Sequence, residues 1–313
     1  MSSVQKTDNW AVIQRRRRIR RALTIFLGLA LMVVVVLGGV GWIASDRALS
    51  PDSRETPWSL DDYPELSPTS VAFDSETGIT LEGRFFPGEW DETVILLHGF
   101  SEQQDQVLPQ ADILNRVGFN VLTYDGRHPD RYGDEVFSTL GAAERFDLIA
   151  AVDYLESRPD VDPERIGVYG ASLGGATAIL GAGLDERLRA VAAEGAFSDG
   201  DSVIASSFER YIGLPAFPFG PVTKRVAEWR AGEHLDDARP VDAIARITDR
   251  PVLLIHGVDD DSVPPDHTER NLAAGGDNID VWWVPGARHF DAHIVVRDEY
   301  ADRIVTFFEE SLR

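Results

Sequence analysis

Short apolar runs alternate with longer helical patterns along most of this 313-residue chain, and this alternation is the feature that most constrains the fold. Runs such as VILLH (94–98) and PVLLIH (251–256) are apolar at consecutive positions rather than at every second one. Strands of this kind are buried on both faces, as in parallel sheets that carry helices on both sides. We therefore expect an α/β architecture with a doubly wound, mostly parallel sheet.

The expected elements cover most of the chain after residue 68. Strands are expected at 70–74, 79–86, 94–98, 120–125, 165–170, 190–195, 251–256 and 279–284, and helices near 106–117, 141–157, 173–184, 266–274 and 297–312. The first two strands meet across a short turn at Gly78, so the sheet should begin with an antiparallel hairpin. Residues 197–249 form a long, amphipathic and aromatic segment between two strands, and we expect a helical cap there.

The amino-terminal region has the composition of a membrane anchor. Residues 22–45 contain no charged side chain, and 24 helical residues rise roughly 36 Å, enough to cross a hydrocarbon core of about 30 Å. Six arginines lie within residues 15–21, and the positive-inside rule places them in the cytoplasm. We expect a cytoplasmic tail (1–21), an uncleaved single-pass anchor (22–45) and a body outside the cytoplasm. The alternatives are a cleaved signal peptide with a secreted body and a buried helix of a soluble protein.

Composition narrows the organisation and the partners of the body. Residues 46–68 are polar and contain four prolines, which indicates a linker before an α/β domain at 69–313. The chain has a net charge of −22, and residues 1–45 carry +6, which leaves −28 for the remainder. A body with this much negative charge repels phosphate backbones, and we therefore expect no nucleic-acid partner. The absence of cysteine excludes disulfides, thiol nucleophiles and thiolate metal sites.

The segment Gly170-Ala171-Ser172-Leu173-Gly174 is a G-x-S-x-G motif between an expected strand and an expected helix. A serine at a tight strand-to-helix turn projects its hydroxyl above the sheet, and small neighbours permit that close approach. The free N–H groups of the new helix face the same point and stabilise negative charge there. A glycine-rich turn whose serine only caps the helix is the alternative. We favour Ser172 as a nucleophile because suitable partners follow it.

A serine hydroxyl becomes a good nucleophile only when a base takes its proton. Among the seven histidines, His289 lies in the loop after the last expected strand, from which a base can reach the carboxyl ends of the strands. His293 is the reserve candidate. A carboxylate must orient the imidazole, and the loop after the preceding strand offers Asp259, Asp260 and Asp261, which position alone does not distinguish. The order serine, aspartate, histidine belongs to one hydrolase architecture.

The negative oxygen of a tetrahedral intermediate needs backbone N–H donors. One donor is expected at Leu173, directly after the candidate nucleophile. The other is expected in the loop after the VILLH strand, within His98-Gly99-Phe100-Ser101, and we assign it to Phe100.

Taken together, these motifs resemble the α/β-hydrolase superfamily and, within it, bacterial membrane-anchored serine hydrolases of the acyl-hydrolase and serine-aminopeptidase-like group. The resemblance covers about residues 68–313 and rests on VILLHGF, NVLTYDGR, VYGASLGG, PVLLIHGVDDDSVP and PGARHF. It implies that Asp260 is the acid of a catalytic triad and that the long insert is a lid. Relatives often read D-x-R-G-H-G-x-S in a loop that shapes the pocket, whereas residues 125–130 read DGRHPD here.

The expected function is therefore cleavage of a small-molecule or lipid-like carboxylic ester through an acyl-enzyme, with Ser172, His289 and Asp260 as the triad. The 197–249 cap is expected to line an apolar acyl pocket. A peptidase or amidase of the same fold, and a non-catalytic surface binding module, are the alternatives. We expect no dinucleotide cofactor, because no G-x-G-x-x-G opens the first βα unit. We also expect no metal, because the His289 and His293 pair lacks the glutamate of H-E-x-x-H.

Overall fold

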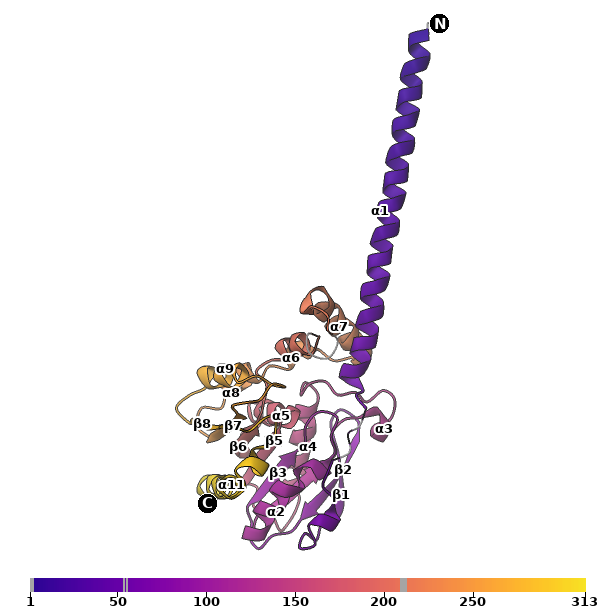
Figure 1. Ribbon diagram of the computed structural model, residues 1–313. Coiled ribbons are helices and arrows are strands. Elements are labelled where there is room, and N and C mark those ends of the chain that lie inside the picture. The colour runs from indigo at the N-terminus through magenta and orange to yellow at the C-terminus, as the bar shows by residue number, and fades with distance from the viewer. Residues whose placement is uncertain (1–2, 53, 55, 209–212) are drawn as a thin grey trace.

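The computed structural model describes residues 3–52, 54, 56–208 and 213–313 and places an eight-stranded sheet at the centre of the body (Figure 1). The strand order is β1-β2-β4-β3-β5-β6-β7-β8. The strands are β1 (Thr69–Asp74), β2 (Thr80–Phe86), β3 (Thr93–Leu97), β4 (Asn120–Tyr124), β5 (Ile166–Ala171), β6 (Leu188–Glu194), β7 (Val252–Gly257) and β8 (Ile279–Val284). Strand β2 pairs antiparallel with β1 and β4, and all later pairs are parallel. The predicted mostly parallel sheet is confirmed.

Helices cover both faces of this sheet, as the continuously buried strands require. The helices outside the insert are α1 (Ser3–Leu49), α2 (Leu108–Val117), α3 (Pro129–Tyr132), α4 (Glu144–Glu156), α5 (Leu173–Ala182), α9 (Asp266–Ala274), α10 (Ala292–Val295) and α11 (Arg297–Leu312), with the short 3-10 turns η1 (Leu60–Asp62) and η2 (Gln104–Val107). One hydrophobic core lies between the sheet and α4 and α5, where Leu148 and Ile179 are buried. A second core lies between the opposite face and α2 and α11, where Leu114 and Phe308 are buried.

The segment between β6 and β7 forms a separate layer above the sheet (Figure 1). It contains α6 (Gly200–Ser207), α7 (Ala216–Ala231), η4 (Leu235–Asp237) and α8 (Pro240–Ile244). Apolar side chains on its underside, among them Ile204 and Ala227, pack against Ala176 of α5 and Phe197 in a third hydrophobic core. We call α6 and α7 the cap.

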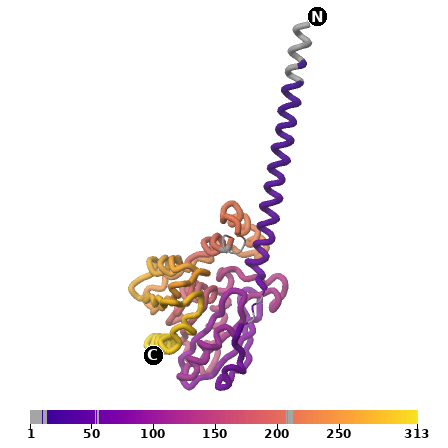
Figure 2. The backbone as a smooth tube through the Cα atoms, in the orientation of Figure 1, coloured from indigo at the N-terminus to yellow at the C-terminus, as the bar shows by residue number. Residues whose placement is uncertain are grey.

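Helix α1 runs away from the body as one continuous helix (Figures 1 and 2). By length and composition, its Gln14–Leu49 portion is able to cross a membrane, with a mean hydropathy of 2.7 in its most apolar window. Its last turns pack on the cap, because Ala44 and Leu49 bury their side chains in the third core. Residues 46–49 are thus helical, although the polar composition of 46–68 indicates a linker.

The chain after α1 also lies against the body. The N–H of Arg54 donates to the carbonyl of Ser101 at 2.8 Å, and His128 Nε2 donates to the carbonyl of Pro51 at 2.7 Å. Further along, Leu66 is buried in the second core. These contacts join the exit of α1 to the body directly.

Candidate active site

Ser172 lies at the turn between β5 and α5 in a strained backbone conformation, with φ +54° and ψ −112°. Only small neighbours allow this turn. A β-carbon on Gly170 would lie 2.1 Å from the carbonyl oxygen of Gly174, and one on Gly174 would lie 2.4 Å from that of Leu97. A positive φ at a serine costs on the order of 1–3 kcal/mol and occurs mainly at functional sites. The glycines of the motif thus hold the Ser172 side chain at the carboxyl edge of the sheet.

His289 bridges Ser172 and Asp260. Its Nε2 lies 2.9 Å from Ser172 Oγ, and its Nδ1 lies 2.6 Å from Asp260 Oδ2. The second carboxylate oxygen of Asp260 accepts the N–H groups of Ser262 and Val263 at 2.8 and 2.9 Å. With Nδ1–H donating to the carboxylate, Nε2 of the neutral ring is the acceptor for the serine hydroxyl proton. The structure thus brings together three residues that lie 117 and 29 positions apart in the chain.

The structure distinguishes the three consecutive aspartates that the sequence left open. The side chain of Asp260 is 1% exposed, whereas Asp259 and Asp261 lie at the surface. Strand β7 ends against the loop that carries the histidine, and a β-carbon on Gly257 would lie 2.4 Å from the carbonyl oxygen of Ala287. This close approach turns the middle aspartate inward toward the histidine.

His293, the reserve candidate for the base, is buried in an aromatic environment. Its ring centroid lies 5.2 Å from that of Trp58, 5.1 Å from that of Phe290 and 6.0 Å from that of Tyr300. Neither ring nitrogen has a hydrogen-bond partner among the described residues, and burial lowers the pKa of His293 to about 4. His293 therefore packs within the fold and does not reach Ser172.

The loop after β3 lies beside the serine. Gly99 approaches so closely that a β-carbon there would lie 3.5 Å from Ser172 Cβ. Two side chains hold this glycine: Gln106 Oε1 accepts its N–H at 2.7 Å, and His98 Nδ1 donates to its carbonyl at 2.8 Å. His98 Nε2 accepts the N–H of Gly126 at 2.7 Å, and burial lowers the pKa of His98, so its ring is neutral.

The two backbone donors expected from the sequence directly follow the two residues that approach each other here, Gly99 and Ser172. Phe100 follows Gly99, and Leu173 is the first residue of α5. Within the described part of the chain, no intramolecular acceptor pairs with either N–H group. Both groups thus remain available to an external oxygen.

Sequence analysis did not single out Glu194, which lies directly beneath the serine. Its backbone carbonyl accepts the Ser172 N–H at 2.8 Å, and its carboxyl accepts the hydroxyls of Tyr169 and Tyr300 at 2.8 and 2.9 Å. Burial raises the pKa of Glu194 to about 7, and the hydrogen bonds from the two tyrosines partly oppose this rise. A glutamate at the end of an apolar strand was the only sequence signal for this buried group.

A hollow of about 560 Å³, part of it open to solvent, lies next to the serine turn. Its lining contains Gly99, Leu173 and Gly174 on the side of the serine, and many of the other lining residues are polar: Ser101, Glu102, Arg127, His128, Ser138, Glu144, Asp147 and Thr177. None of the described residues of the 197–249 segment lines it. The loops after β3 and β4 and the helices α4 and α5 supply the walls of this hollow, so it is not the apolar acyl pocket expected under the cap.

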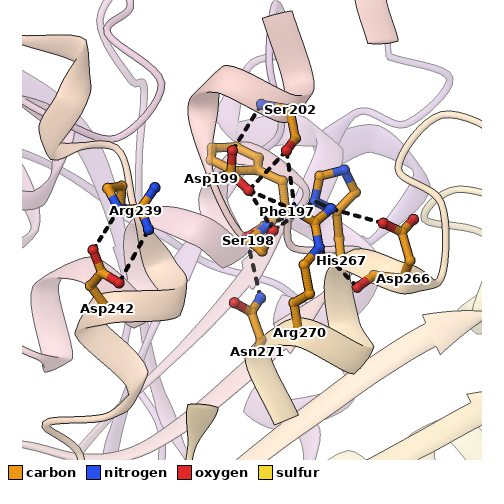
Figure 3. Close-up of polar contacts among 10 residues, drawn as sticks. All are labelled: Phe197, Ser198, Asp199, Ser202, Arg239, Asp242, Asp266, His267, Arg270 and Asn271. Carbon is orange, nitrogen blue, oxygen red and sulfur yellow. Dashed lines mark hydrogen bonds and ion pairs between the residues drawn. The ribbon is translucent and has the colours of Figure 1, made fainter. Parts of the chain in front are cut away.

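A polar cluster joins the start of the cap to α9 (Figure 3). Asp199 caps α6, because its Oδ1 accepts the N–H of Ser202 at 2.8 Å, and its Oδ2 accepts Arg270 Nη1 at 2.8 Å. The backbone N–H of Ser198 donates to His267 Nδ1 at 3.1 Å. Burial and the nearby positive charge of Arg270 lower the pKa of His267. This cluster joins the chain between β6 and α6 to helix α9.

Potential metal ligands do not gather in this region. Across the described ranges, no group of three or more histidine, aspartate or glutamate side chains is arranged to hold a metal ion.

Comparison with known proteins agrees with this architecture. Residues 106–313 match the prolyl oligopeptidase family. The chain is 28% identical over 214 residues to YqkD, an uncharacterized protein of Bacillus subtilis, covering 67% of this chain and 69% of YqkD. It is 27% identical over 276 residues to the uncharacterized protein YfhR of Escherichia coli K12, covering 85% of each. Among solved structures, the esterase Pf2001 of Pyrococcus furiosus superposes with a TM-score of 0.68 and 25% identity, over 85% of this chain and 99% of that one.

Proposed function

This chain belongs to the prolyl oligopeptidase family within the α/β-hydrolase superfamily of serine hydrolases, and from that premise we propose that it hydrolyses carboxylic esters through an acyl-enzyme. The observation that carries the proposal is the continuous hydrogen-bonded path from Ser172 through His289 to Asp260. The similarity to an esterase over almost the whole of that enzyme's length supports an ester as the substrate.

In the proposed reaction, Ser172 Oγ attacks the carbonyl carbon of the ester while its proton passes to His289 Nε2. Asp260 keeps Nδ1 of His289 protonated and stabilises the imidazolium that forms. The N–H groups of Phe100 and Leu173 bind the negative oxygen of the tetrahedral intermediate. Its collapse transfers the proton from His289 to the leaving alcohol, and water then releases the acid from Ser172 by the same steps.

Labelling with a fluorophosphonate probe tests this proposal. We expect the full-length protein in detergent to form a covalent adduct that is absent in Ser172→Ala. Ser157→Ala is the matched control, because Ser157 is exposed at the end of α4 and its hydroxyl only donates to the carbonyl of Tyr154. A folded wild-type protein that does not react would refute an activated serine and favour a non-catalytic binding module.

A peptidase or amidase of the same mechanism is the second candidate, and the match to the prolyl oligopeptidase family favours it. The two candidates differ in the leaving group that His289 must protonate. A p-nitrophenyl ester and a p-nitroanilide with the same acyl group distinguish them. Turnover of the ester with no measurable turnover of the anilide supports the esterase, and the reverse result supports the amidase.

We also propose that α1 remains attached as a single-pass membrane anchor, with the basic tail in the cytoplasm and the catalytic domain, about residues 69–313, outside it. The arginines at 15–21 and the burial of Ala44 and Leu49 against the cap support this topology. Carbonate washing and mass measurement test it: the intact chain should stay in the membrane pellet, whereas a shorter chain in the supernatant would indicate signal cleavage.

A further inference from the structure

Helix α7 presents several exposed side chains to the outside of the cap. Pro221, Arg225 and Trp229 lie four residues apart on the regular part of the helix, and Phe217 lies at its kinked start, where φ is −98° and ψ is 132°. We call these four exposed residues the stripe. Phe217 is 79% exposed and Trp229 is 74% exposed, the two highest values among large apolar side chains of the described residues. Aromatic rings combined with a basic side chain are characteristic of helices that lie at a membrane surface.

The length of α1 fixes where the membrane surface lies relative to this helix. This step rests on the anchor proposed above. The uncharged run begins at residue 22, directly after Arg21, and a hydrocarbon core of about 30 Å takes roughly 20 helical residues. The core therefore ends near Gly41, and Trp42 lies at the level of the lipid headgroups, where tryptophan is enriched.

Helix α7 contacts α1 at this level. The rings of Trp42 and Trp229 lie 6.0 Å apart, and the guanidinium of Arg230 lies 4.7 Å from the Trp42 ring and donates to Asp46 at 2.7 Å. A β-carbon on Gly41 would lie 2.9 Å from Val222 Cγ1, so the glycine permits the close approach of the two helices. In Figures 1 and 2 the cap is the part of the body on the side toward which α1 extends.

We propose that the stripe formed by Phe217, Pro221, Arg225 and Trp229 rests on the lipid bilayer, so that the cap is a second membrane contact besides α1. The two contacts together fix the orientation of the body. The third core joins α1 and the cap to Leu140 and to Ala176 of the serine helix, so the body follows the same orientation. The cap then remains at the surface of the bilayer while the carboxyl edge of the sheet lies beneath it.

The chain contains no cysteine, so single cysteines can be labelled without interference. We would introduce Phe217→Cys, attach a bimane fluorophore and reconstitute the full-length protein in phosphatidylcholine vesicles that contain nitroxide-labelled phosphatidylcholine. Arg225→Cys is a second position on the stripe that keeps both aromatic rings. Leu31→Cys reports the span, and Val117→Cys, exposed at the end of α2, reports the body away from α1.

The proposal requires that the nitroxide lipid reduce the fluorescence at positions 217, 225 and 31 and leave that at position 117 unchanged. Loss of fluorescence at position 31 alone would refute the cap contact and leave the anchor intact. Full fluorescence at all four positions would refute the anchor and the cap contact together. Fluorophosphonate labelling of the same samples reports the activated serine separately, so a failure of the esterase proposal cannot be mistaken for either result.

Discussion

The backbone carbonyl of Glu194 accepts the N–H of Ser172 at 2.8 Å, so the strained turn of the candidate nucleophile is joined to the end of the neighbouring strand. The same glutamate carries a fully buried carboxyl that contacts two tyrosine hydroxyls. An ionisable group thus lies buried next to the turn of the candidate nucleophile.

This burial predicts a pH dependence of stability. The pKa of Glu194 is raised from 4.5 to about 7 in the folded protein. Between these values the unfolded chain has lost the proton that the folded chain keeps, so the free energy of unfolding falls as pH rises and becomes level above about pH 7. Glu194→Gln removes this contribution. We expect its melting temperature to fall less than that of the wild type between pH 4.5 and pH 7.5, and equal declines would contradict the prediction.

The three consecutive aspartates provide matched variants for the triad. Asp260→Asn should lower kcat by roughly 10³–10⁴, because the imidazole loses the carboxylate that holds its tautomer. Asp259→Asn and Asp261→Asn should stay near the wild-type rate, because both side chains lie at the surface. Hydrolysis of a p-nitrophenyl ester measures all three. The assignment is wrong if Asp260→Asn is the mildest of them.

Removal of either reacting group should have the largest effect on turnover. We expect Ser172→Ala and His289→Ala each to lower kcat by roughly 10⁴–10⁶, and the double variant to be no worse than either single one, since the two residues act as a unit. A purified His289→Ala protein that retains wild-type turnover would exclude His289 as the base.

The charged side chains in the lining of the hollow predict a preference for short acyl groups. In an apolar pocket each added methylene would contribute about 0.8 kcal/mol, or roughly fourfold in kcat/KM. Side chains such as Glu102, Arg127 and Asp147 provide no such gain. The kcat/KM for p-nitrophenyl acetate or butyrate should therefore exceed that for the dodecanoate. A steady rise through the dodecanoate would show that another, apolar surface holds the acyl chain.

Two aspartates near the cap test the polar cluster of Figure 3. Asp199→Ala removes the cap of α6 and the partner of Arg270, and should lower the free energy of unfolding by about 1–2 kcal/mol. Asp242→Ala removes an ion pair whose two side chains, Arg239 and Asp242, are 45% and 51% exposed, and should cost less than about 0.5 kcal/mol. Urea unfolding of the two variants measures the difference. Equal losses would mean that the cluster does not hold the cap.

Local patterns were enough to locate most of the elements and to select the candidate site residues. The expected strand at 165–170 is β5 at Ile166–Ala171, and the G-x-S-x-G motif forms the predicted strand-to-helix turn. His289 was selected because a loop after the last parallel strand must lie at the carboxyl edge of the sheet. These inferences succeed because periodicity and turn chemistry act over a few residues.

Other features depend on contacts between distant segments. The sequence alone does not distinguish Asp259, Asp260 and Asp261 from one another. In the structure, the end of β7 packs against the loop that carries His289, and the carboxyl of the middle aspartate is buried. The cap helices bury apolar side chains against Phe197 and the end of α1, which their amphipathic pattern alone did not indicate. Composition cannot show which partner an amphipathic helix selects.

The sequence by itself determined the class of the fold, the place of the candidate nucleophile and the presence of a segment long and apolar enough to span a membrane, because each depends on local spacing and hydrophobicity. Only the tertiary structure decided which aspartate meets His289, where Glu194 lies and how Trp42 meets Trp229. These relationships join residues from 22 to 187 positions apart. These contacts depend on close packing between distant segments, which no local pattern in the sequence indicates.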